Sequence, residues 1–230
     1  MAAAAAVLRG KAVEKGFFWS LLVVVLAVSA LPGSASATVY LMAAGLILGL
    51  SVVETGYSMA YRDELTGLPS RRAFPDTLAA LGSRYAIAMV DIDHFKQFND
   101  KHGHDVGDQV LRMVAGKLGR VAGGGRAFRY GGEEFAVIFA GRSRDEAMPH
   151  LEELRSAIGN AKFTVRGHPR ARSRLKGAKR KSTRRKKLAV TVSIGVAERN
   201  GRYTTPERVL KAADKALYRA KRAGRNQVRT

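Results

Sequence analysis

The sequence predicts an α+β domain over residues 61–230, preceded by an apolar helical segment. Three observations indicate this class. Short strand-like runs such as Tyr85 to Val90 alternate along the chain with segments of helical apolar spacing such as Gln109 to Leu118. A two-glycine turn joins two further strand-like runs. The first 60 residues instead contain long uncharged stretches, which are typical of a membrane anchor.

The N-terminal segment predicts a transmembrane hairpin over residues 17–60. Phe17 to Leu31 and Thr38 to Val53 are uncharged and mostly aliphatic, with an uncharged turn between them. Each run is shorter than the ~20 residues of a spanning helix, but flanking aromatic residues can extend it through the interface. Basic residues precede the first run and follow the second. The positive-inside rule therefore places residues 1–16 and the C-terminal domain in the cytoplasm.

A second interpretation of this segment stays open. Its basic start, its apolar core and Ala35-Ser36-Ala37 also resemble a secretory signal with a cleavage site. Immediate continuation into a second apolar run favours the hairpin, and cleavage would still leave that run as an anchor. A buried helix pair is disfavoured because the runs lack polar periodicity. The chain has no cysteine, which excludes disulfides and thiol chemistry.

The elements of the domain follow from periodicity and turn signals. Helices are predicted over Ser70 to Leu81, Gln109 to Leu118 and Asp145 to Asn160, and strands over Tyr85 to Val90, Arg126 to Tyr130 and Glu134 to Ala140. The alternation from Leu188 to Val196 predicts a half-buried strand. Thr205 before Pro206 predicts a helix start, and Gly224 predicts the stop of that helix.

Residues able to hold a metal–triphosphate group stand at the two-glycine turn. Gly131 and Gly132 lack a Cβ, so their backbone can turn tightly and approach a phosphate. Glu133 and Glu134 follow at once, and Asp91 leaves a buried strand from which it can face them. Carboxylates beside bare backbone suit Mg²⁺ and a triphosphate. An ordinary glycine hairpin with solvated acids would explain the turn taken alone.

Three polar residues follow Asp91 and extend this candidate site. Asp108 stands near the start of the predicted helix, where an N-cap is the plain alternative. For His104 the alternative is a surface loop residue, and for Asn99 it is a turn residue. Each alternative is reasonable singly, but their combination with the glycine–carboxylate hairpin favours one shared site.

Five segments, in this order, resemble the GGDEF family of diguanylate cyclases. They are residues 63–74, 91–108, 129–137, 190–197 and 212–226, and the resemblance covers roughly Asp63 to Thr230. It implies a central, mainly antiparallel sheet flanked by helices, similar to the palm of nucleotide polymerases and class III adenylate cyclases. It also implies an enzyme that condenses two GTP into cyclic di-GMP and two pyrophosphates, on the cytoplasmic side of a bacterial inner membrane.

The resemblance further implies roles for individual residues. Asp91, the carbonyl of Ile92 and Glu133 would hold Mg²⁺, or alternatively Mn²⁺, with Glu134 as a supporting carboxylate. Glu133 matches the acceptor of the 3′-hydroxyl proton, although the division of labour between the glutamates stays open. The implied substrate-binding residues are Phe95, Lys96, Asn99, His104, Asp108, Gly131, Gly132, Lys221 and Arg225. Among these, Asn99 and Asp108 match guanine readers, and the basic residues match phosphate ligands.

One domain holds one GTP, so the resemblance implies a homodimer, paired through the hairpin and the stretch Val52 to Arg62. Residues 122–125 read Ala-Gly-Gly-Gly where many members carry an inhibitory Arg-x-x-Asp pair, so no inhibitory site is predicted. A catalytically inactive nucleotide receptor with this fold is the alternative function. The intact set of Asp91, Glu133 and Glu134 favours the enzyme.

A basic insertion is predicted over residues 166–187. It contains twelve Lys or Arg and no acid, and without these charges the net charge of +21 would fall to +9. A solvated loop and a contact with anionic lipid headgroups are both open interpretations. Phosphate contacts with nucleic acid are a third. The absence of aromatic residues from this segment argues against single-strand binding.

Overall fold

A computed structural model describes residues 12–29, 35–161, 163–164 and 187–230. The chain divides into two compact units, Met1–Arg62 and Asp63–Thr230. The turn between the two apolar runs was predicted over residues 32–37; residues 32–34 lie outside the described residues, and residues 35–37 are helical. Nearly all of the predicted basic insertion also lies outside the described residues.

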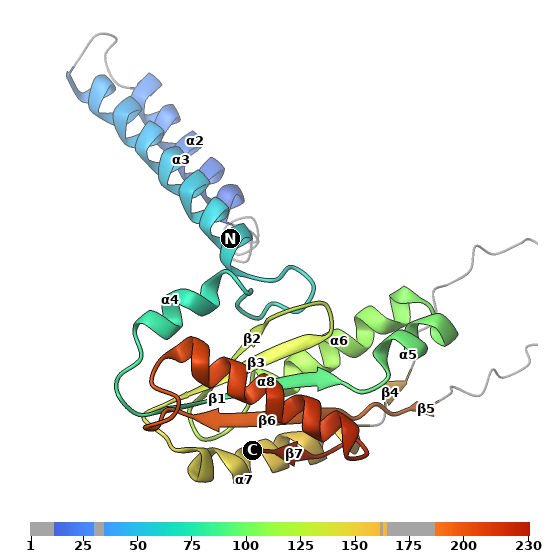
Figure 1. Cartoon of the computed structure of the whole chain (residues 1–230). Coiled ribbons are helices and arrows are strands. Elements are labelled where there is room, and N and C mark those ends of the chain that lie inside the picture. The colour runs from blue at the N-terminus through green and yellow to red at the C-terminus, as the bar shows by residue number, and fades with distance from the viewer. Residues whose placement is uncertain (1–11, 30–34, 162, 165–186) are drawn as a thin grey trace, which may run out of the picture. The chain divides into compact units, whose positions relative to one another are not determined.

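The first unit contains helices α2 (Ala12–Ser29) and α3 (Ala35–Tyr61), which lie side by side (Figure 1). Many of their large apolar side chains are exposed. Of the described helices, α3 is the one long and apolar enough to cross a membrane, judged by length and composition. The hairpin of two membrane spans therefore stays a prediction.

The second unit is built on a five-stranded sheet in the order β2-β3-β1-β6-β7 (Figure 1). The strands are β1 (Tyr85–Ile92), β2 (Gly125–Arg129), β3 (Glu134–Ala140), β6 (Val192–Glu198) and β7 (Val228–Arg229). All described pairings in this sheet are antiparallel except β6–β7. A separate two-stranded ribbon joins β4 (Phe163–Thr164) to β5 (Lys187–Leu188). The predicted α+β class and the mainly antiparallel sheet are confirmed.

Helices cover both faces of the sheet, so β1 is buried along its whole length. The helices of this unit are α4 (Ala73–Ala79), α5 (Phe95–His102), α6 (His104–Leu118), α7 (Arg144–Gly159) and α8 (Pro206–Arg222). Apolar residues of α6 and α7 pack on alternate residues of β1, β3 and β6. Helix α8 packs on β6 and β1 from the opposite face, and Phe74 of α4 stacks edge-on against Phe128 of β2. The sheet therefore has buried apolar side chains on both of its faces.

The predicted helix boundaries needed two corrections. Residues 70–72 are not helical, because Ser70 forms a β-bridge with Arg129. Helix α6 begins at His104, and a further short helix, α5, precedes it after a break at Gly103. The sequence of α5 is mostly polar, which hid its helical periodicity. Asn99 and His104 therefore lie on helices, and Asp108 is not an N-cap.

The predicted strand over Leu188 to Val196 is wrong in extent and in burial. It is interrupted between β5 and β6, and β6 is buried on both faces because α8 covers the second one. The start and stop of α8 are confirmed. Thr205 Oγ1 accepts a hydrogen bond from Arg208 N at 3.4 Å, and Pro206 is the first helical residue. Gly224, with φ of 106°, ends the helix in a conformation that glycine adopts without strain.

Candidate active site

Strand register brings the three predicted acidic residues together. β1 and β3 are antiparallel neighbours in which Asp91 pairs with Glu134. Ile92 N donates a hydrogen bond to Glu133 O at 3.4 Å, so the hairpin tip lies against the end of β1. Asp91 is only 4% exposed. The site therefore stands at one edge of the sheet, where β1 ends and β3 begins.

The two hairpin positions suit glycine for different structural reasons. Tyr130 N and Gly131 N both donate to Glu134 O, at 2.9 and 3.0 Å, which closes a tight turn. A Cβ on Gly131 would lie 2.7 Å from Glu134 Oε2, so a side chain there would displace the glutamate. Around Gly132, in contrast, no atom lies within 4 Å of an added Cβ. Gly132 leaves bare backbone beside open space, which suits the approach of a phosphate.

A clamp that the sequence analysis missed holds this hairpin. Arg129 Nη1 donates to both carboxylate oxygens of Asp63, at 2.8 and 2.9 Å. Its Nη2 and Nε donate to the carbonyls of Gly132 and Gly131, at 2.9 and 3.3 Å. Asp63 also accepts hydrogen bonds from the amide and hydroxyl of Thr66. An aspartate three residues before a threonine was the available signal, since that spacing favours a side-chain-capped turn.

The hydrogen bonds of this clamp favour the ionised form of Asp63. Burial alone would raise its pKa, but the hydrogen bonds from Thr66 and Arg129 outweigh burial and lower it. The first residue of the second unit is thus tied to the backbone of the glycine hairpin.

Lys221 reaches Asp91 from the far end of α8. Its Nζ lies 2.8 Å from Asp91 Oδ2. This reach depends on Gly195 of β6, because a Cβ at that position would collide with the backbone of Ala213 and Leu217 in α8. Without a side chain at Gly195, the helix lies directly on the strand and its last turn comes close to the carboxylates.

The carboxylates lie in an environment that disfavours their charge. Burial raises the pKa of Asp91, with Glu134 and Asp93 adding to the rise and Lys221 opposing it. Burial and the neighbouring Asp91 charge likewise raise the pKa of Glu133. Cations at this place would relieve both effects.

The donor set fits a hard cation held jointly with a substrate. Among the described residues, no group of three His, Cys, Asp or Glu side chains is arranged as a complete metal site. Mg²⁺ is commonly bound by one or two carboxylates together with substrate phosphates and water. The carboxylate oxygens of Asp91 and Glu133 are compatible with that mode.

Asn99 and Asp108 come from adjacent helices, α5 and α6. The side chain of Asn99 fills the space where a Cβ on Gly107 would stand, which places it beside the turn that carries Asp108. Asn99 Oδ1 is buried and has no hydrogen-bond partner among the described residues. A buried acceptor without a partner is costly unless a ligand supplies a donor. The neighbouring predicted residues differ in exposure: Phe95 is buried, whereas Lys96 and His104 are exposed.

Arg225 lies in the turn after α8, and its neighbour is held by a residue that the sequence analysis did not select. Asp93, which is 7% exposed, accepts a hydrogen bond from Asn226 N at 3.1 Å. The sequence Asp91-Ile92-Asp93 could have drawn attention to the second aspartate, but it does not indicate the hydrogen-bond partners of Asp93.

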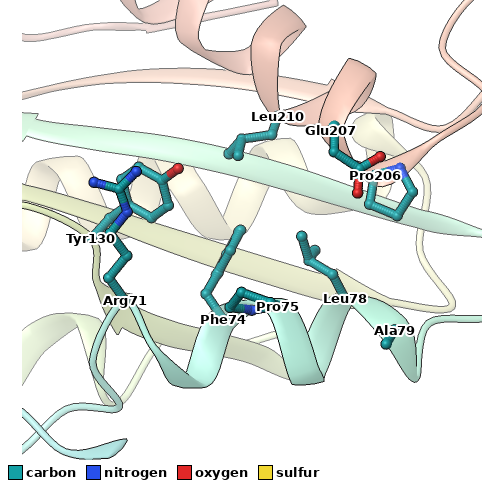
Figure 2. A pocket seen from close by; sticks show the side chains of 9 residues that line it. All are labelled: Arg71, Phe74, Pro75, Leu78, Ala79, Tyr130, Pro206, Glu207 and Leu210. Atoms are coloured by element: carbon teal, nitrogen blue, oxygen red, sulfur yellow. The ribbon is translucent and has the colours of Figure 1, made fainter. Parts of the chain in front are cut away.

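A cavity of about 350 Å³ opens between α4 and the start of α8 (Figure 2). Its walls are mostly apolar, and Arg71 lies over the ring of Tyr130 at 4.7 Å from the ring centre. The lining residues are Arg71, Phe74, Pro75, Leu78, Ala79, Tyr130, Pro206, Glu207 and Leu210. None of the predicted site residues lines it, and Tyr130 is its connection to the glycine hairpin.

The second unit of the chain is thus an α+β domain whose mainly antiparallel sheet carries carboxylates at the end of β1 and at the β2–β3 hairpin. The family described as "Diguanylate cyclase, GGDEF domain" matches residues 60–173 and 164–227. The response regulator PleD of Caulobacter vibrioides is 38% identical over 181 residues, which cover 74% of this chain and 36% of PleD. Diguanylate cyclase DgcP of Pseudomonas aeruginosa is 37% identical over 186 residues, 77% of this chain and 25% of DgcP.

A solved structure agrees with these relatives. The GGDEF domain of DgcB from Caulobacter crescentus, in complex with c-di-GMP, is 40% identical, with a TM-score of 0.62. The match covers 74% of this chain and 92% of that one. The chain therefore belongs to the GGDEF-domain diguanylate cyclase family. The chain spans only part of the length of these relatives, 36% of PleD and 25% of DgcP.

Proposed function

We propose that this chain is a diguanylate cyclase that condenses two GTP into cyclic di-GMP and two pyrophosphates. The observation that carries the proposal is the convergence of Asp91, Glu133 and Lys221 at one edge of the sheet. Three segments distant in sequence thereby supply two metal-binding carboxylates and a phosphate-binding cation. Family membership supports the same reaction.

The residues divide the work between holding the triphosphate and moving a proton. Gly132 and the turn after Ile92 offer bare backbone to the β- and γ-phosphates, while Lys221 and Arg225 supply positive charge. Bound Mg²⁺ supplies neutralisation of phosphate charge and stabilises the leaving pyrophosphate. Glu133 accepts the proton of the attacking 3′-hydroxyl, and Glu134 supports that carboxylate. Mn²⁺ offers the same ligand preference for oxygen.

Residues of helices α5 and α6 recognise the guanine base in this proposal. Asn99 Oδ1 is buried without a partner among the described residues, so it offers an acceptor to a base that donates hydrogen bonds. Asp108 offers an acceptor carboxylate to the N1–H and amino group of guanine, which adenine lacks in this arrangement. His104 begins α6 and shapes this end of the site.

Catalysis requires two copies, because each domain holds one GTP and the 3′-hydroxyl of one must reach the α-phosphate of the other. The length and apolar character of α3 support an inner-membrane anchor with the catalytic unit in the cytoplasm. The basic segment 166–187 is proposed to contact anionic lipid there, in preference to nucleic acid.

We propose no product-inhibition site at residues 122–125. A Cβ on Gly125 would lie 2.7 Å from Val121 Cγ1 and 2.8 Å from Phe139 Cε1, so an aspartate there would not fit without rearrangement.

The test is turnover of GTP with Mg²⁺ by the detergent-solubilised chain, with the product identified by mass. Glu133→Ala is expected to abolish cyclic di-GMP, whereas Glu153→Ala, which removes an exposed glutamate of α7, should leave the rate unchanged. ATP should give no cyclic product. A folded, dimeric parent that binds GTP but makes no product would favour the inactive-receptor alternative instead.

A further inference from the structure

Asp93 is a buried hub in the turn between β1 and α5. Its Oδ1 accepts a hydrogen bond from Ser193 Oγ at 2.7 Å. Its Oδ2 accepts from Thr191 Oγ1 at 2.7 Å and from Asn226 N at 3.1 Å. Among the described residues it forms no ion pair. A buried carboxylate is costly unless its oxygens are satisfied, and here three neutral donors satisfy them.

The turn that Asp93 holds has an unusual backbone. Gly224, Arg225 and Asn226 follow one another with φ of 106°, 62° and 45°. Residues other than glycine rarely adopt positive φ, so this turn needs support from its surroundings. Arg225 N donates to Ala220 O at 3.0 Å, and the Asn226 side chain accepts from Arg155 Nη1 at 2.9 Å. The hydrogen bond from Asn226 N to Asp93 joins this turn to the residue that follows β1.

Two links therefore connect the same pair of segments. The first is the ion pair of Lys221 with Asp91, and the second is the hydrogen bond of Asn226 with Asp93. In the proposed reaction Lys221 binds phosphate and Asp91 binds the cation, so substrate would compete with the first link. The second link involves neither of these side chains, so substrate does not compete with it directly.

We infer that Asp93 is a positioning residue that holds the Arg225 turn against the β1–α5 turn, so that both face one triphosphate. The inference rests on the proposed function for the identity of that substrate. Asp93 acts through Arg225 and does not itself touch the nucleotide. Its loss should weaken contacts to the β- and γ-phosphates and leave contacts to guanine intact.

Equilibrium binding to the full chain in detergent with Mg²⁺ tests this inference. The two probes are α,β-methylene-GTP, whose methylene bridge blocks release of pyrophosphate, and GMP, which lacks the β- and γ-phosphates. Asp93→Ala should weaken binding of the triphosphate analogue about tenfold, the scale of a lost charge-assisted contact, and change GMP binding less than twofold. Asp93→Asn, which is nearly isosteric, should give an intermediate loss. Asp76→Asn, at an exposed position of α4, is the matched control.

If Asp93 had a purely structural role, its loss would weaken the binding of both ligands equally, and that outcome would overturn the inference. A second measurement addresses the route of action. On an Arg225→Gln background, Asp93→Asn should cause no further loss of the triphosphate-to-monophosphate affinity ratio. An additional loss there would show that Asp93 acts independently of Arg225. Because binding needs no turnover, a parent that makes no cyclic di-GMP would refute the proposed reaction, and the binding measurements would still test the role of Asp93.

Discussion

The Arg129 clamp offers the sharpest test of how this structure holds its hairpin. Arg129→Ala removes two hydrogen bonds to Asp63 and two to the glycine carbonyls. The side chains of Arg129 and Asp63 are 16% and 22% exposed, so the pair is largely shielded from solvent. Removing one partner of a shielded ion pair costs ~3–5 kcal/mol. Because Asp63 keeps its hydrogen bonds from Thr66, we expect a destabilisation near the lower end of that range, about 3 kcal/mol.

A matched arginine on the surface provides the control for this prediction. Arg84 forms an ion pair with Glu146 at 2.6 Å, but the two side chains are 61% and 42% exposed. Exposed pairs contribute ~0–1 kcal/mol, so Arg84→Ala should cost little. Arg129→Lys keeps the charge but loses the planar guanidinium group. Its loss of stability should therefore lie between those of Arg129→Ala and Arg84→Ala.

Calorimetric unfolding of the variants in detergent would measure the difference. For a domain of this size, each kcal/mol shifts Tm by about 2–4 °C, so Arg129→Ala should lower Tm by about 6–12 °C. Tryptophan fluorescence would not serve, because the single tryptophan, Trp19, lies in α2 of the other unit. Equal shifts for Arg129→Ala and Arg84→Ala would refute the reasoning. GTP turnover should fall with Arg129→Ala, since the glycine carbonyls lose their support.

Three further predictions concern packing, capping and pH. Gly195→Ala should push α8 off β6, cost about 1–3 kcal/mol and lower GTP turnover by moving Lys221, whereas Gly116→Ala, with open space around it, should not destabilise. Ser143→Ala breaks the capping box of α7 and should cost about 1 kcal/mol in thermal unfolding with turnover unchanged. The folded pKa of Asp63 is lowered, so its stabilisation is full above about pH 4 and is lost as pH falls through the folded pKa. The stability gap between the parent and Asp63→Asn should therefore narrow on acidification, and a constant gap would contradict the assignment.

Local chemistry explains what could be predicted. The strands on either side of Gly131-Gly132 were placed within one residue, because a two-glycine turn between apolar runs leaves few alternatives. The start of α8 was found because a threonine cap and a proline at the first helical position act within one turn of the chain. The strand pairing of Asp91 with Glu134 then followed from their places at neighbouring strand ends.

Other features escaped prediction because they depend on contacts across the fold. The short helix α5 is polar along most of its length, and its stability comes from packing of Phe95 and from its neighbour α6. The burial of β6 on both faces depends on α8, and nothing in the sequence of the strand itself indicates that this helix covers it.

The sequence by itself predicted the residues of the candidate site: the glycines and acids of the hairpin from their chemistry, and the roles of the basic residues only through the resemblance to the GGDEF family. The tertiary structure alone decided which contacts support these residues. The Arg129 clamp joins residues 66 positions apart, and the Asp93 hub reaches across 133 positions to Asn226. Hydrogen bonds of this kind form only after the sheet is assembled, so no local pattern encodes them.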